Sequence, residues 1–165
     1  MRTGLKAIVA LTLLASGCSG YDRPGAGGPP PVDSIRFSLN SWGREVGRWQ
    51  IRADGSGEWA QEDRDAPRVA PLIVTPIPAD ATHMAEIRAI LARAEAIAPD
   101  GLKCRKEIYD LPYGFIEWNR ADGTRRINFD LGCTSKQADA VFGALKAADD
   151  KVGGWAAAAK KGKTP

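Results

Sequence analysis

The sequence predicts an α+β fold, in which an antiparallel β-sheet of five to six strands packs against two α-helices. Short runs of alternating apolar and polar residues occur in two groups, before residue 76 and between residues 114 and 131. Tight-turn dipeptides separate the runs within each group, which is typical of antiparallel strands. Two longer segments instead carry apolar residues at three- and four-residue spacing, the period of an amphipathic helix. The strands therefore form a meander and a hairpin, and the helices cover them.

The first group of runs predicts the meander. Its three runs alternate so that one face is apolar, and the turn Asp54-Gly55 joins the second run to the third, residues 58–60. The apolar residues that face one side are Ile35, Phe37, Leu39, Trp49 and Ile51. A fourth run, residues 72–75, lies between Pro71 and Pro76, which confine it to a sheet edge.

The first helix is expected over residues 80–98, because Asp80 or Thr82 can cap its start and Pro99 ends it. A hairpin follows, with strands over 114–120 and 125–131. Thr134 and Gln137 have the spacing of a capping box at the start of the second helix. That helix carries an apolar stripe and is weakened at two glycines. The stripe consists of Val141, Leu145, Ala148 and Val152, and the glycines are Gly153 and Gly154.

The amino-terminal 17 residues have the features of a secretory signal: two early cations, an apolar stretch of about nine residues and small residues before Cys18. The stretch is about half the ~20 residues that cross a bilayer as a helix, so no transmembrane anchor is expected. Residues 18–33 are rich in Gly and Pro and predict a flexible tether. The globular domain is expected over residues 34–155, and a disordered basic tail over residues 156–165.

The run Leu14-Ala15-Ser16-Gly17-Cys18 resembles the lipobox of bacterial lipoproteins, although Ala15 stands where that family usually has Leu. The resemblance implies cleavage before Cys18 and acylation of this cysteine, by palmitate or a similar chain. Ser19 is not the aspartate that often signals inner-membrane retention, so the resemblance implies an anchor in the outer membrane, facing the periplasm. The alternative is an ordinary cleavable signal followed by an incidental cysteine.

Charge and composition exclude some partners. The chain has 23 basic and 20 acidic residues, and loss of Arg2 and Lys6 with the signal leaves 21 against 20. A nearly balanced domain of this kind does not suggest a nucleic-acid partner. The expected partners are the membrane, through the lipid, and an envelope protein or glycan.

Cys104 and Cys133 remain after Cys18 is acylated, and in an oxidising envelope compartment they are expected to form a disulfide. The alternative is two buried free thiols. The sequence offers one histidine and no CxxC pair, so neither a metal site nor a cofactor is expected.

Aromatic residues give the best candidates for ligand binding, because a few exposed aromatic side chains often carry most of the binding energy. The segment from Tyr109 to Gly114 combines two aromatic residues, a carboxylate and a proline inside the expected disulfide loop. The candidate binding residues are Tyr109, Asp110, Tyr113, Trp49, Trp59 and Trp118. We expect a non-enzymatic binding or assembly module whose ligand the sequence does not identify.

Two other functions remain open. A hydrolase of cell-wall glycan or peptide would need two converging carboxylates, and acidic residues gather near the second hairpin. These are Glu107, Asp110, Glu117 and Asp130. Ser56-Gly57 at a hairpin tip resembles the Ser-Gly loop of lipoprotein lysozyme inhibitors, which implies a periplasmic enzyme inhibitor. His83 stands in the first turn of a surface helix, where a histidine is expected to be solvated rather than catalytic.

Overall fold

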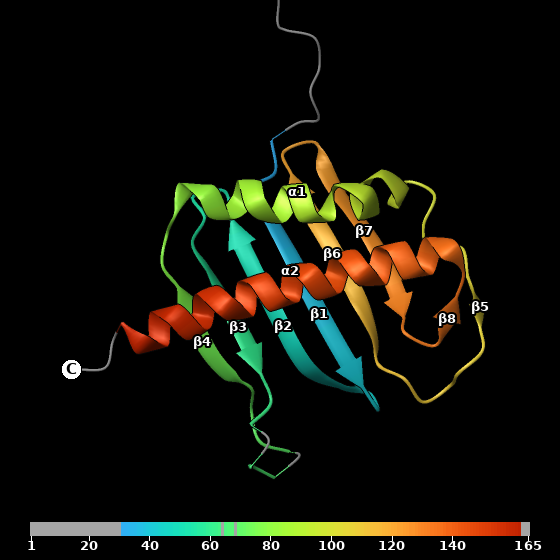
Figure 1. Cartoon of the computed structure of the whole chain (residues 1–165), viewed down its shortest axis with the longest axis horizontal. Coiled ribbons are helices and arrows are strands. Elements are labelled where there is room, and N and C mark those ends of the chain that lie inside the picture. Colours follow the sequence, from blue (N-terminus) through green and yellow to red (C-terminus); the bar gives the residue numbers. More distant parts are fainter. Residues whose placement is uncertain (1–30, 64, 68, 163–165) are drawn as a thin grey trace, which may run out of the picture.

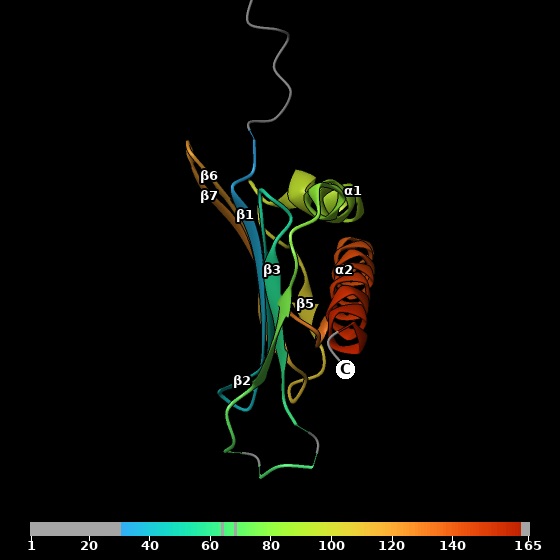
Figure 2. The ribbon, with the colours of Figure 1, turned by 90° about the vertical axis from the view of Figure 1, so that its left-hand side faces the viewer.

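Six antiparallel strands form the main sheet of the computed structural model, which describes residues 31–63, 65–67 and 69–162 (Figure 1). Both long helices lie on the same face of this sheet, as the edge-on view shows (Figure 2). The main strands are β1 (Ser34–Ser41), β2 (Arg44–Arg52), β3 (Gly57–Gln61), β4 (Ile73–Ile77), β6 (Tyr113–Arg120) and β7 (Gly123–Asp130). The other elements are α1 (Ala81–Ile97), α2 (Lys136–Lys161) and the short strands β5 (Arg105–Lys106) and β8 (Cys133–Thr134). This arrangement confirms the predicted α+β fold.

The strand order of the main sheet is β4-β3-β2-β1-β6-β7, so the second hairpin is added beside β1 rather than beside β4. Ile35 in β1 lies opposite Ile51 in β2 and Trp118 in β6. This register places the apolar residues of the central strands on one face. The edge strand β4 contains Pro76, as expected, because an edge position needs no amide on its outer side.

The core lies between this face and the two helices. Its largest fully buried side chains are Trp49, Trp118, Ile35, Ile51, Ile87, Leu91, Ile116, Ile127, Val141 and Val152. The opposite face of the sheet is polar, and neither α1 nor α2 crosses it (Figure 2). A sheet with one packed and one solvated face produces the alternation seen in the sequence.

The helix starts show one agreement and one difference. Asp80 caps α1 and accepts a hydrogen bond from the Thr82 amide at 2.9 Å. The expected capping box at α2 is replaced, because Ser135 is the N-cap and Gln137 instead accepts from the Lys103 amide at 2.8 Å. Gln137 therefore fastens the segment before β5 to the start of α2.

The carboxyl-terminal part of α2 also differs from the prediction, because the helix continues through both glycines to Lys161. Burial explains the difference. Ala156 is 1% exposed, and the Trp155 ring stacks on His83 with centroids 3.8 Å apart. Gly153 lies beside the Trp59 ring, where a Cβ atom would make ordinary van der Waals contact at 3.4 Å. Residues 156–161 are helical rather than a disordered tail.

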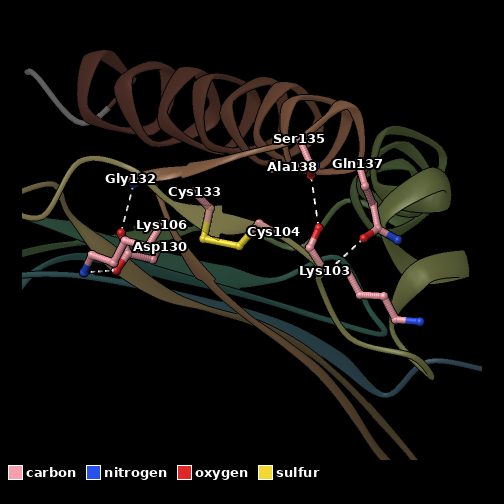
Figure 3. Close-up of a disulfide and its surroundings, with 9 residues drawn as sticks. All are labelled: Lys103, Cys104, Lys106, Asp130, Gly132, Cys133, Ser135, Gln137 and Ala138. Carbon is pink, nitrogen blue, oxygen red and sulfur yellow. Dashed lines mark hydrogen bonds and ion pairs between the residues drawn. A yellow bond between two sulfur atoms is a disulfide. The ribbon is translucent and has the colours of Figure 1, made fainter.

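Cys104 and Cys133 form a disulfide with their Cα atoms 5.4 Å apart, which confirms the predicted pairing (Figure 3). The disulfide lies beside the small β5-β8 sheet, in which Lys106 pairs with Cys133. The predicted signal, Cys18, the tether up to residue 30 and Lys163 lie outside the described residues.

Candidate binding site

The turn between β1 and β2 presents a tryptophan to solvent. Its two central residues, Trp42 and Gly43, have φ angles of 51° and 76°. Positive φ at both positions is characteristic of a type I′ hairpin turn, which Asn-Gly and Asp-Gly usually supply. Trp42 is 78% exposed, so burial does not compensate for the left-handed backbone. A large aromatic residue at this position costs stability, and such local strain is often found at functional sites.

The connection from β5 to β6 lies beside this turn and brings two tyrosines to it. Tyr109 is 72% exposed and Tyr113 is 42% exposed. Together with the turn they line a pocket of about 180 Å³. We call its lining residues the aromatic cluster: Trp42, Lys106, Tyr109, Asp110, Leu111 and Tyr113.

The connection that carries the cluster is fixed at both ends. The Glu107 amide donates to the Gly132 carbonyl oxygen at 2.9 Å, and the Leu131 amide donates to the Pro112 carbonyl oxygen at 2.9 Å. A Cβ atom on Gly132 would lie 1.8 Å from the Ile108 carbonyl oxygen, so only glycine permits this close approach. With the disulfide, these contacts hold the loop in one conformation before a ligand arrives.

An ion pair between Lys106 and Asp130 lies at the aromatic cluster. Lys106 Nζ lies 2.6 Å from Asp130 Oδ2 (Figure 3). The same atom lies 5.5 Å from the centroid of the Tyr109 ring. Burial around Asp130 opposes its ionisation, but hydrogen bonds from Lys106 and the Gly132 amide outweigh it and lower the pKa of Asp130. The Asp130 carboxylate therefore stays ionised at neutral pH and holds the ammonium group of Lys106 beside the Tyr109 ring.

The predicted binding residues divide into two groups. The structure brings Tyr109, Asp110 and Tyr113 together, as the sequence suggested. Trp49 and Trp118 are 1% and 0% exposed, and Trp59 is half-buried against the core. These three tryptophans lie on the sheet face that the helices cover. They therefore do not form an exposed aromatic surface that could bind a ligand. The polar residues between them occupy the open face instead.

Trp42 is the site residue that the sequence analysis did not single out. The available signal was its position: Trp42-Gly43 follows one alternating run and precedes another, where a two-residue turn belongs. A tryptophan at such a turn is exposed by geometry, because both neighbouring strands end there.

Three of the four acidic residues considered for hydrolysis, Glu107, Glu117 and Asp130, are paired with cations. Arg126 donates to Glu117 from Nε at 2.7 Å, and Arg105 donates to Glu107 from Nε at 3.0 Å. The hydrogen bond from Arg105 also lowers the pKa of Glu107. A general acid for glycan cleavage needs a raised pKa, so Glu107 does not suit that role. Within the described ranges, no three His, Cys, Asp or Glu side chains form a metal site.

His83 is buried rather than solvated. Its Nδ1 atom donates to the Gly55 carbonyl oxygen at 2.9 Å, and its ring stacks on Trp155. The β2-β3 turn is thereby packed against α1. Gly57 is buried, and a Cβ atom on Gly55 would lie 1.7 Å from the Asp80 carbonyl oxygen. A turn held in this way does not protrude as an inhibitory loop would.

The comparisons with known proteins found no family model that matches the chain and no matching curated sequence. Among the helices of the described ranges, neither is both long and apolar enough to cross a membrane.

Proposed function

We propose that this protein is a non-enzymatic binding module of the cell envelope, held by a lipid on Cys18, which binds cell-wall glycan through the aromatic cluster. The observation that carries the proposal is Trp42, a 78% exposed tryptophan in a strained turn beside two exposed tyrosines. Because this arrangement costs stability, a gain in binding is the physical reason to keep it.

The size and chemistry of the site support a glycan over a folded protein partner. A stable protein interface involves about 20–30 residues on each side, whereas six residues line this pocket of about 180 Å³. Aromatic ring faces cover the apolar face of a sugar ring, and Lys106 and Asp110 can exchange hydrogen bonds with its hydroxyl groups.

The test is cosedimentation of the purified protein with isolated cell-wall sacculi. We expect Trp42→Ala and Tyr109→Ala each to weaken binding about tenfold, because aromatic anchors carry most of the energy in such sites. Val69→Ala is the matched control, since Val69 is 90% exposed and is not part of the cluster. Glu117→Gln should also bind normally.

Three results would count against the proposal. Binding that survives both cluster substitutions would place the ligand elsewhere. Release of soluble fragments from sacculi, lost in Glu117→Gln, would favour the hydrolase. Sacculi that fail to bind the wild-type chain, with an envelope protein retained through Trp42, would favour the protein partner.

A further inference from the structure

A second cavity lies on the helix side of the sheet, apart from the aromatic cluster. In Figure 1, α2 crosses the sheet diagonally, and neither helix crosses the lower parts of β1 and β2. Between α2 and the uncovered part of the sheet lies a groove of about 450 Å³, a volume typical of small-molecule sites. Its lining is apolar apart from two side chains, and most of it comes from Phe37, Leu39, Phe129, Leu131, Phe142 and Leu145.

The two polar side chains in the groove are Lys146 and Asp149. The ammonium group of Lys146 is already paired, because its Nζ atom lies 2.6 Å from Asp150 Oδ2. Asp149 is therefore the charged group that remains for a ligand in the groove. Burial raises the pKa of Asp149, while the indole N–H of Trp59 donates to its carboxylate and limits the rise. A half-buried carboxylate is stabilised by a cationic partner.

The two ends of the groove differ in polarity. Phe142 and Asp149 are seven residues apart on α2, which separates them by about 10 Å along the helix. Phe142 and Leu131 lie at the apolar end, and the Phe142 ring packs edge-on against Phe129 at 6.3 Å. An extended ligand would thus have an apolar body at this end and its charged group at the other.

We propose that this groove binds a single-chain amphiphile with a cationic head, the ammonium group at Asp149 and the alkyl chain along the phenylalanines. Charge complementarity selects this class, because a fatty acid would bring a second carboxylate to Asp149 and a simple alcohol would leave its charge uncompensated. The site is independent of the proposed glycan binding.

Calorimetry with decylamine, decanol and decanoate tests the ligand class, at concentrations below micelle formation. The full chain with Cys18→Ala is used, so that no acyl chain competes for the groove. We expect decylamine to bind at least tenfold more tightly than decanoate, and affinity to rise about fourfold per methylene from hexylamine to decylamine. Equal binding of decylamine and decanoate, or no binding of decylamine, would overturn the proposal.

Three variants locate the site. Asp149→Asn keeps an acceptor for the Trp59 indole and should weaken decylamine about tenfold while leaving decanol unchanged. Gly143→Phe should abolish binding, because Gly143 lines the groove and a Cβ atom there meets nothing within 4 Å. Gly154→Phe is the matched control, as Gly154 also lies in α2 with open space around it but does not line the groove. Normal decylamine binding by Gly143→Phe would show that the groove is not the site.

Discussion

Trp42 is the residue at which stability and binding oppose each other. Its φ of 51° is disfavoured for a residue with a Cβ atom, and asparagine tolerates this region better than tryptophan does. We expect Trp42→Asn to raise the free energy of unfolding by about 1 kcal/mol and to weaken sacculus binding about tenfold. Urea unfolding followed by circular dichroism measures the first effect, and cosedimentation measures the second.

The neighbouring glycine supplies the control for this prediction. Gly43→Ala adds a Cβ atom at a φ of 76° without any steric contact within 4 Å, so only backbone strain changes. It should lower the free energy of unfolding by about 1 kcal/mol. A Trp42→Asn variant that is less stable than the wild type would show that the indole contributes to folding.

His83 is the residue that joins three elements. Its imidazole stacks on Trp155 of α2 and donates to the β2-β3 turn from α1. We expect His83→Ala to lower the free energy of unfolding by about 2 kcal/mol, since the buried Gly55 carbonyl loses its partner and the stacked pair is lost. Chemical denaturation measures this loss. His83→Phe keeps the stacking and should lose about half as much; a stable His83→Ala would refute the structural role.

At the scale of elements, sequence patterns predicted both helices and all six main strands, because the alternation follows from a sheet with one buried face. Three features depend on contacts between distant residues and could not be predicted. The small β5-β8 sheet pairs residues 105–106 with residues 133–134, which are far apart in the sequence and lie at the disulfide. Gln137 leaves its capping role because the Lys103 amide is near. α2 continues through Gly153 and Gly154 because a residue beyond them, Ala156, is buried against the core.

The candidate site shows the same division. Tyr109 and Tyr113 were predictable because Pro112 and the expected disulfide placed them in a constrained loop. The exposure of Trp49 and Trp118 could not be predicted, because an indole in an alternating run fits a packed face as well as a solvated one. Trp49 pairs with Phe37 and Trp118 pairs with Ile35, on the face that the helices cover. This register explains why both indoles are buried.

The disulfide constrains the loop that carries most of the aromatic cluster. Loss of the disulfide should therefore affect both stability and binding. Cys104 and Cys133 are separated by 29 residues, and their link restricts the unfolded chain. We expect Cys133→Ala to lower the free energy of unfolding by about 2–5 kcal/mol and to weaken sacculus binding. Denaturation of the wild type and of the variant measures the difference, and reduced wild-type protein should resemble the variant. Two reactive thiols besides Cys18 in denatured, non-reduced protein would contradict the bond.

At the scale of the whole molecule, the described chain begins at the end of the sheet that is opposite to the aromatic cluster. The Asp33 amide donates to the Asn119 carbonyl oxygen at 2.8 Å, near the β6-β7 turn. Trp42 comes directly after the other end of β1 (Figure 1). The eight residues of β1 span about 27 Å, which separates the two ends. If the proposed lipid anchor precedes β1, the tether and the cluster therefore lie at opposite ends of the sheet, and the anchor leaves the cluster accessible.

Because the start of β1 and the aromatic cluster lie at opposite ends of the sheet, membrane anchoring and glycan binding should be independent. Cys18→Ala tests this independence. If the thiol of Cys18 is the acylation site, as the lipobox resemblance implies, the wild-type protein should enter the detergent phase and the variant should stay in the aqueous phase. Because the cluster lies at the opposite end of the sheet, the variant should still cosediment with sacculi as the wild type does. Trp42→Ala should show the reverse, with detergent partitioning intact and sacculus binding weakened about tenfold. Unchanged membrane association of Cys18→Ala would refute the lipid anchor, and loss of both properties in either variant would show that anchoring and binding depend on one surface.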